Sequence, residues 1–130
     1  MPSAKTLERF IFRVEQNAHA EAAEEFYMPN ASIQENQSAP RIGRDTQIKR
    51  ERDLLTKARA ISSHCVRPVF VSGDRVVIRW QFRFDWLDGT STRMEEIAYQ
   101  YWDGQRIAEE TFFYDPAQRV PISNAARNET

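Results

Sequence analysis

The stretch Arg75-Val-Val-Ile-Arg-Trp-Gln-Phe-Arg-Phe-Asp-Trp86 decides the fold, because its side chains alternate in character. Every second residue from Val76 onward is apolar, and from Arg79 onward the residues between them are polar. A period of two over this length predicts a β-strand. The pairs Asp88-Gly89 and Asp103-Gly104 are typical hairpin turns. Three consecutive antiparallel strands are therefore predicted, over residues 75–86, 90–102 and 106–114.

The segment before this meander predicts mainly helices. Residues 3–27 carry apolar side chains at helical spacing, with Ser3 as an N-cap and an interruption at residues 17–19. A third helix is expected to open at Gly43, with Asp45 as its N-cap. The other expected elements are a short extended segment at residues 31–36, a loop at 37–41 and a strand at 61–72. Pro68 within that last strand indicates an edge strand or a bulge.

Helices gathered on one face of an antiparallel sheet define an α+β domain. We predict a single domain over residues 1–115, in which a cone-shaped, curved antiparallel sheet wraps around about three N-terminal helices. A sheet of this shape forms a small container, which favours the binding of a small molecule. Residues 116–130 are polar, hold two prolines and are expected to form a loose tail.

The composition limits the kinds of partner. The 130 residues are 41% hydrophobic, enough for one core without disulfides or metal. The formal net charge of −1 and the scattered basic residues argue against a nucleic-acid or membrane surface. Cys65 is the only cysteine, so an intrachain disulfide and a cysteine-rich metal site are excluded. There is neither a signal-peptide pattern nor a run of roughly 18 apolar residues, so we expect a cytoplasmic protein.

Three segments carry a resemblance to a known family. Phe26-Tyr-Met-Pro-Asn-Ala-Ser-Ile-Gln-Glu35 and Pro40-Arg-Ile-Gly-Arg-Asp-Thr-Gln-Ile48 precede Trp102-Asp-Gly-Gln-Arg-Ile-Ala-Glu-Glu-Thr-Phe-Phe-Tyr-Asp115. Together they resemble the nuclear transport factor 2-like superfamily, and more narrowly its SnoaL-like proteins, which are related to polyketide cyclases and ketosteroid isomerases. The resemblance spans roughly residues 5–115 and implies the nuclear transport factor 2-like or cystatin-like roll. It specifies no activity, because this fold hosts many functions.

The resemblance also implies roles for single positions. The general base of ketosteroid isomerases lies on the short first strand, and the matching residue here is Glu35. The two oxyanion-hole donors of those isomerases match Phe10 and Ala98, whose side chains cannot donate a hydrogen bond. The histidine and aspartate of the polyketide cyclases match Ala98 and Phe112. Neither mechanism is therefore expected in its known form.

Two assignments are open for the face of the meander that lines the pocket. With an even-length hairpin at Asp88-Gly89, Arg79 pairs with Ala98, and the polar and aromatic side chains lie on opposite faces. The family register turns the polar face, with Glu96, toward the pocket and leaves the aromatic face outside. Hydrophobic patterning alone buries the aromatic face under the helices instead. We favour the family register.

Three carboxylates are candidate catalytic residues: Glu35, Glu96 and Glu110. At the floor of an apolar container, Glu35 would have a raised pKa and could transfer a proton. The alternative is that Glu35 pairs with a nearby arginine. Glu96 and Glu110 beside Arg79 could form an acid–base pair or bind a polar ligand. The alternative for these two is a structural salt-bridge network.

The remaining candidates are ligand-binding residues. His64, on the strand at 61–72, could act as a base in the pocket, although a lone strand histidine is more often structural. His19 falls between two helices and is expected to be exposed. Two separated histidines and four scattered glycines indicate neither a metal site nor a phosphate-binding loop, so no metal and no cofactor are expected. The predicted ligand-binding residues are Phe10, Tyr27, His64, Arg79, Ala98, Gln100, Trp102 and Phe112.

Two functions are consistent with these residues. The first is proton transfer on a small, mostly apolar, carbonyl-containing molecule with Glu35 as base, in a pocket of roughly 300 Å³ or more. The second is a non-catalytic ligand-binding or dimerisation module. Under either function a homodimer is expected, because the outer aromatic face would be too large an exposed patch for a monomer. The predicted dimer residues are Trp80, Phe82, Tyr99, Tyr101 and Phe113.

Overall fold

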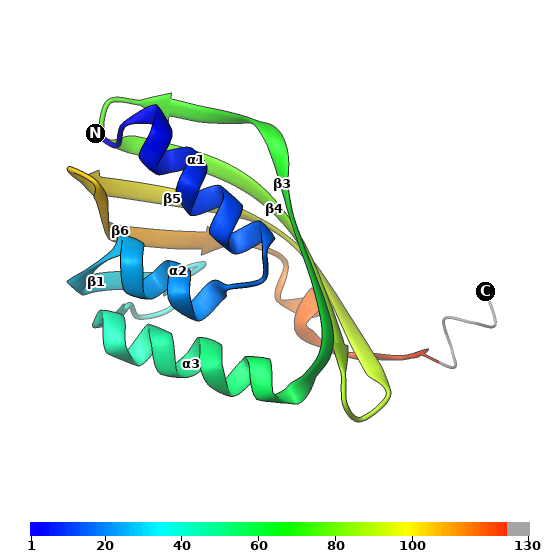
Figure 1. Cartoon of the computed structure of the whole chain (residues 1–130). Helices are drawn as coiled ribbons and strands as arrows, with labels where there is room; N and C mark the ends of the chain where they lie inside the picture. Colours follow the sequence, from blue (N-terminus) through cyan, green and yellow to red (C-terminus); the bar gives the residue numbers. More distant parts are fainter. Residues whose placement is uncertain (125–130) are drawn as a thin grey trace.

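The computed structural model describes residues 1–124 and shows helices packed against one bent sheet (Figure 1). The helices are α1 (Ala4–Glu15), α2 (His19–Phe26) and α3 (Arg44–Lys57), with a 3₁₀ turn, η1, at Pro116–Arg119. The strands are β1 (Tyr27–Glu35), β2 (Arg41–Ile42), β3 (Ala58–Ser72), β4 (Arg75–Trp86), β5 (Thr90–Asp103), β6 (Arg106–Phe113) and β7 (Ile122–Ser123). The predicted α+β class is confirmed.

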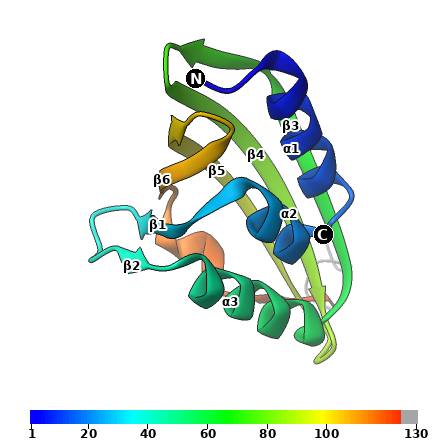
Figure 2. The same ribbon diagram turned by 60° about the vertical axis from the view of Figure 1, so that its left-hand side comes forward.

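The strand order is β2-β1-β6-β5-β4-β3, and β7 pairs with β5 outside this path. All neighbours are antiparallel except β1 and β6, which pair in parallel. β3 lies at an edge, and its register shifts between Val66 and Phe70, so Pro68 occupies an irregularity of an edge strand, as predicted. All three helices lie on the concave side of the sheet (Figures 1 and 2).

The helix boundaries follow from local residues. The Ser3 hydroxyl caps α1 by accepting a hydrogen bond from the Thr6 amide at 3.0 Å. Asn17, with φ of 65°, separates α1 from α2. The N-cap of α3 is Gly43 at φ of 111°, so the prediction of Asp45 was wrong. Asp45 lies in the first turn, where its negative charge interacts favourably with the positive end of the helix dipole.

The register between β4 and β5 differs by one residue from the predicted one. Ile78 pairs with Ala98 and Trp80 pairs with Glu96, whereas the even-length hairpin would pair Arg79 with Ala98. The reason is the turn: residues 87–89, an odd number, separate the two strands. Gly89 closes the turn at φ of 85°, a conformation that glycine adopts without strain.

This register places the aromatic side of β4 and the polar side of β5 on the same concave face. Trp80 and Phe82 therefore face the helices together with Glu96, and their predicted outward position is wrong. The inward position predicted for Arg79 is also wrong, because Arg79 lies on the convex face in an ion pair with Glu95. Hydrophobic patterning was right for β4, and the family register was right for β5.

The segment after β6 is not the loose tail that was predicted. Residues 116–119 form η1, and β7 pairs with Thr90 and Ser91 at the start of β5. This pairing is available because β6 pairs only with residues 97–103 of β5 and leaves the rest of that edge free. The ordered segment carries Arg119 toward the concave face. Residues 125–130 of the predicted tail lie outside the described residues.

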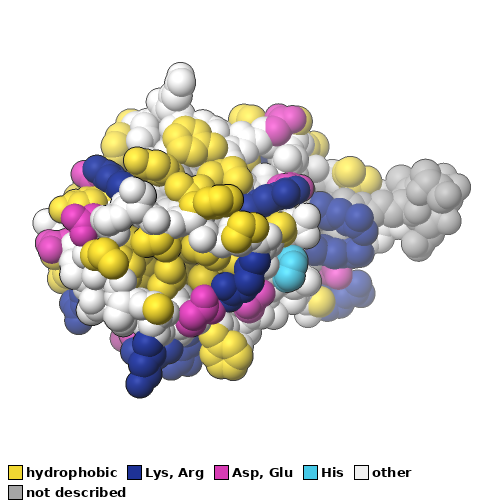
Figure 3. Space-filling view, turned by 90° about the horizontal axis from the view of Figure 1, so that it is seen from above, with side chains coloured by type: hydrophobic (Ala, Val, Ile, Leu, Met, Phe, Trp, Pro, Cys, Tyr) yellow, Lys and Arg dark blue, Asp and Glu magenta, His cyan; other side chains and the backbone are white. Residues whose placement is uncertain are grey.

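The core fills the space between the helices and the concave face. Its completely buried side chains come from both layers: Ile11, Ile33, Val76, Ile78, Trp102 and Ile107. Large hydrophobic side chains also remain at the surface, among them Phe12 and Phe70. Seen from above, the molecule shows hydrophobic side chains gathered between charged ones (Figure 3).

Two neighbouring positions on α1 test this assignment of the core. Ile11→Ala should lower the free energy of unfolding by about 2–5 kcal/mol, because it leaves a cavity between α1 and the sheet. Phe12→Ala, at a side chain that is 61% exposed, should change it by about 0.5 kcal/mol or less. Urea denaturation of both variants gives the comparison. Similar losses in the two would show that the buried face of α1 is assigned incorrectly.

Candidate functional site

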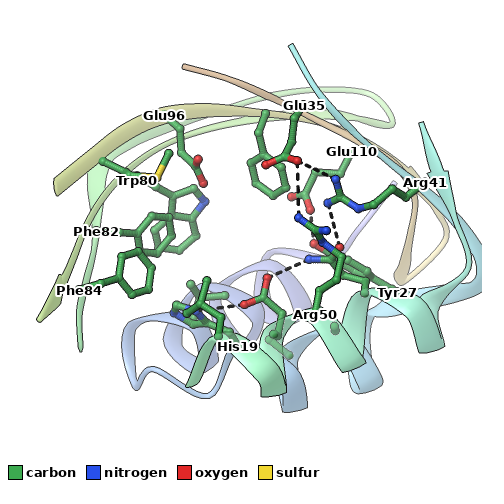
Figure 4. A pocket seen from close by; sticks show the side chains of 18 of the residues that line it. His19, Tyr27, Glu35, Arg41, Arg50, Trp80, Phe82, Phe84, Glu96 and Glu110 are labelled. Carbon is green, nitrogen blue, oxygen red and sulfur yellow. Dashed lines mark hydrogen bonds and ion pairs between the residues drawn. The ribbon is translucent and has the colours of Figure 1, made fainter. Parts of the chain in front are cut away.

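A cavity of about 370 Å³ lies between the concave face of the sheet and the helices (Figure 4). Trp80, Phe82 and Phe84 of β4 form one side of it, which we call the aromatic wall. The rings of Trp80 and Phe82 stack with their centroids 5.5 Å apart. The other apolar lining residues are Phe10, Val14, Ala22, Ala23, Leu54, Met94 and Phe112. The volume is in the range of small-molecule sites.

Glu96 extends from β5 into this cavity beside Trp80, its cross-strand neighbour (Figure 4). Within residues 1–124 its carboxyl group has no hydrogen-bond or ion-pair partner. Burial, with smaller contributions from the negative charges of Glu110, Glu51 and Glu35, raises the pKa of Glu96 to about 8. A group that titrates near neutral pH is suited to both accept and donate a proton.

Glu110 of β6 is buried and held by hydrogen bonds. Its carboxyl group accepts from the Tyr27 hydroxyl and, at 2.5 Å, from Gln100 Nε2. Gln100 Oε1 in turn accepts from Trp102 Nε1 at 2.9 Å. Burial raises the pKa of Glu110 to about 7, although the two hydrogen bonds favour its ionised form. Burial and the charge of Glu110 also raise the pKa of Tyr27 well above its ordinary value.

The pKa of Glu35 shifts in the direction opposite to the predicted one. Burial alone would raise it, but Arg41 Nη1 lies 2.6 Å from one oxygen and Arg119 Nη1 lies 3.3 Å from the other. The Tyr114 hydroxyl donates a further hydrogen bond at 3.0 Å, and Arg50 Nη2 lies 3.8 Å away. These contacts hold the pKa of Glu35 below its ordinary value. The alternative that Glu35 pairs with a nearby arginine is therefore the arrangement found.

A second polar group faces the cavity from the helices. His19 Nε2 lies 2.8 Å from the Ser63 hydroxyl, and His19 Nδ1 lies 3.6 Å from a Glu51 oxygen. The other Glu51 oxygen accepts from Gln47 Nε2 at 2.8 Å. The His19 ring also packs edge-on against Phe82. The expectation that His19 is exposed was wrong, since only 10% of its side chain is accessible.

The predicted ligand-binding residues fall into three groups. Those that line the cavity are Phe10, Tyr27 and Phe112. Ala98, Gln100 and Trp102 point to the same side of the sheet, but they are fully buried in the core and do not line the cavity. Those that lie away from the cavity are Arg79, on the convex face, and His64, whose side chain is 63% exposed beside Glu15. The inward position of His64 is corrected because His64 is the cross-strand partner of Gln81, on the outward side of β4.

The aromatic wall follows from the alternative that was not favoured, in which the aromatic face of β4 is buried, and three arginines of the cavity were not predicted. Trp80, Phe82 and Phe84 could have been found, because the apolar side of an alternating strand is normally the buried one. Arg41, Arg50 and Arg119 belong to β2, α3 and η1. No sequence spacing connects these three elements, so their convergence on Glu35 had no signal in the sequence.

Three other features of the described residues bear on a metal site, a membrane span and a reactive cysteine. Residues 1–124 contain no group of three or more His, Cys, Asp or Glu side chains placed to hold a metal ion. None of the described helices has the length and apolar character needed to cross a membrane. Burial raises the pKa of the Cys65 thiol, which disfavours its reactive thiolate form.

No protein-family model matches the chain, and a search of curated proteins finds no significant match. Solved structures do match it. A candidate SnoaL-like polyketide cyclase from Mesorhizobium loti has 20% identity and a TM-score of 0.71, over 88% of this chain and 100% of that one. An NTF2-like protein of unknown function from Burkholderia pseudomallei has 14% identity and a TM-score of 0.71, over 87% and 90%. An LEH-like epoxide hydrolase from M. tuberculosis has 10% identity and a TM-score of 0.71, over 88% and 83%.

These matches and the strand order show that the chain has the nuclear transport factor 2-like fold. Within that fold its structural neighbours include SnoaL-like proteins, in agreement with the resemblance carried by the sequence. The neighbours named above include a candidate cyclase and a hydrolase, so the fold alone does not select an activity.

The raised pKa of Glu96 predicts how stability depends on pH. Between the ordinary carboxyl value of 4.5 and about 8, the folded protein keeps a proton that the unfolded chain has lost. The stability from this proton is therefore fully present below about 4.5 and is lost as the pH rises toward 8. One retained proton corresponds to about 1.4 kcal/mol per pH unit. The free energy of unfolding should fall from pH 5 to 8.5.

Glu96→Gln should reduce this pH slope, because the amide has no proton to retain. Glu110 acts in the same direction up to about pH 7, so the slope should shrink in the variant without disappearing. Glu95→Gln, at the exposed neighbouring position, is the matched control and should keep the wild-type slope. Urea denaturation at several pH values provides the measurement. Identical slopes in the wild type and Glu96→Gln would contradict the assigned environment of Glu96.

Proposed function

We propose that this chain binds a small, mostly apolar molecule in the cavity and transfers a proton on it, with Glu96 as the acid–base residue. The observation that supports this is the Glu96 carboxyl group, which faces the cavity beside the aromatic wall and has no partner within residues 1–124. Its pKa of about 8 places both protonation states within reach at neutral pH. Glu96 is one of the three carboxylates predicted from the sequence as catalytic, although Glu35 was the predicted base.

The reaction class would be proton transfer beside a carbonyl group. The Glu96 carboxylate would remove a proton from the carbon next to the carbonyl and leave an enolate. In a molecule with a carbon–carbon double bond next to that carbon, the enolate is conjugated and the same proton would return to the far carbon of the double bond, so the net reaction is a double-bond isomerisation that needs no further reactant. Glu110 and Tyr27 line the same cavity as a hydrogen-bonded pair, in which the Tyr27 hydroxyl donates to the Glu110 carboxyl group.

Glu35 takes a different part in this proposal. Its ion pairs with Arg41 and Arg119 keep it ionised at neutral pH, which makes it a weak base. Its role would be to hold the arginines in place at the cavity. A non-catalytic ligand-binding module is the second candidate function. It is favoured by Phe10, Ala98 and Phe112, which occupy the positions of the known catalytic groups and cannot exchange protons.

Hydrogen–deuterium exchange on a ketone tests the catalytic proposal. In D₂O, the wild type should speed the loss of the α-proton NMR signals of 4-phenylbutan-2-one above the buffer rate. Glu96→Gln should lower this rate by about a hundredfold or more, since general base catalysis contributes at least that much. Glu95→Gln should retain it. Circular dichroism checks that the variants are folded.

Two results would contradict the assignment to Glu96. Full exchange activity in Glu96→Gln would exclude it as the base. Loss of activity in Glu35→Gln alone would return that role to Glu35. Saturable binding of the ketone without any exchange would favour the non-catalytic module.

We also propose that the convex face of the sheet pairs with a second copy of the chain. Ile97 and Phe113 are cross-strand neighbours there and are 37% and 48% exposed, and Tyr99 is 42% exposed. Arg75 packs over the rings of Tyr99 and Tyr101. These side chains form an apolar strip across β5 and β6. A second copy would remove the strip from water.

Sedimentation velocity at micromolar concentration tests this pairing. The wild type should sediment as a dimer, and Phe113→Arg as a monomer, because the interface would bury an unpaired charge. Phe12→Arg, at an exposed position of α1, should remain dimeric. A monomeric wild type would refute the proposed interface.

A further inference from the structure

The arginines around Glu35 bear on the chemical class of the ligand. Arg41, Arg50 and Arg119 all line the cavity and all face the Glu35 carboxylate, at 2.6, 3.8 and 3.3 Å. We call these three residues the arginine cluster. One carboxylate compensates only one of three guanidinium charges, so the cluster carries an excess of two positive charges.

The cluster also has hydrogen-bond donors to spare. Arg41 uses both terminal nitrogens, on Glu35 and Gln47, but its Nε is buried without a partner in the described chain. The contact of Arg50 with Glu35 is too long for a hydrogen bond. The Arg50 and Arg119 side chains are 45% and 49% exposed. Arg119 uses Nη1 for Glu35 and for the Tyr114 hydroxyl, at 3.1 Å, which leaves its other nitrogens for a ligand.

The other acidic residues of the cavity do not remove this excess. Glu51 and Asp53 line the cavity from α3, but neither forms an ion pair with the arginine cluster among the described residues. Glu51 is held instead by Gln47 and His19. Burial raises the pKa of Glu96 to about 8 and that of Glu110 to about 7, so Glu96 is mostly neutral at pH 7 and Glu110 is only partly ionised. The positive charge near Glu35 is therefore available to a ligand.

We propose that the ligand of this cavity is an apolar molecule that carries a carboxylate group. Its carboxylate binds Arg50 and Arg119, and its hydrocarbon body lies along the aromatic wall. Guanidinium groups bind carboxylates through paired hydrogen bonds, which fixes the orientation of the ligand as well as its charge. The inference rests on the proposed function of the cavity as a small-molecule site, and it names the substrate class of that site.

The aromatic wall and Glu96 also offer a place for an organic cation, since rings and a carboxylate attract ammonium groups. The observations favour the anion. Glu96 is largely protonated at neutral pH, whereas the guanidinium groups keep their charge. An amine is therefore the competing ligand in the test below.

Calorimetry with three matched probes tests the inference: 4-phenylbutanoate, 4-phenylbutanamide and 4-phenylbutylamine. The wild type should bind the carboxylate about tenfold more tightly than the amide, and the amine should be the weakest. Arg50→Gln and Arg119→Gln should each remove most of this preference, because they weaken binding of the charged carboxylate far more than binding of the neutral amide. Arg52→Gln, two residues along α3 and outside the cavity lining, should retain the preference.

Several results would overturn the inference. These are equal affinity for carboxylate and amide, tighter binding of the amine, a preference that survives both arginine substitutions, or no binding of the carboxylate at millimolar concentration. Failure here is distinguishable from failure of the proposed proton transfer. Carboxylate preference without ketone exchange would remove only the catalytic step, and exchange without the preference would remove only the substrate class.

Discussion

Residues 87–89 connect β4 to β5, and this odd number decides which side chains share the concave face. A two-residue turn would place Arg79 opposite Ala98 and would move every β4 side chain to the other face of the sheet. Glu96 would then lie among arginines, and Trp80 would be exposed. With the turn as it is, Glu96 pairs with Trp80 and projects beside the aromatic wall, so burial dominates its pKa. The chemistry of the cavity depends on this register.

Three carboxylates in one cavity are given different properties by their surroundings. Glu35 meets Arg41 and Arg119 and is stabilised as an anion. Glu110 is buried but accepts hydrogen bonds from Tyr27 and Gln100, and its pKa rises to about 7. Glu96 has burial and negative neighbours without such bonds, and its pKa rises to about 8. Pairs of groups whose environments separate their pKa values are the usual basis for assigning acid and base roles.

Local patterns in the sequence were enough for the fold and only partly enough for the site. Alternation predicted β4, helical spacing predicted α1, and three segments together, the first of them ending at Glu35, carried the resemblance to the SnoaL-like proteins. The predicted β4–β5 register was wrong because Asp88-Gly89 fits a two-residue and a three-residue turn equally well, and the choice depends on packing of the whole sheet. The arginine cluster was not predicted, for a related reason. Its members are brought together only by tertiary structure. The sequence alone does not tell whether a carboxylate such as Glu35 is buried without a partner or paired with an arginine.

Among the cavity carboxyl groups, Glu96 lowers the stability of the fold most, and this suits a residue that serves the ligand rather than the fold. Glu96 is half-buried, and the burial that raises its pKa is not offset by a hydrogen bond from residues 1–124, as the burial of Glu110 is. Taking a carboxyl group partly out of water without such a bond makes the folded protein less stable than an apolar side chain of similar size would. The neighbouring Met94 and Trp80 show that apolar packing suits this part of β5 and β4. A partner missing from the protein can be supplied by a ligand, and then the same burial strengthens the new hydrogen bond. The arginine cluster, around Glu35, would fix the charged end of that ligand. Two separated polar points joined by an aromatic wall would hold a molecule in one orientation, which is the condition for selective proton transfer.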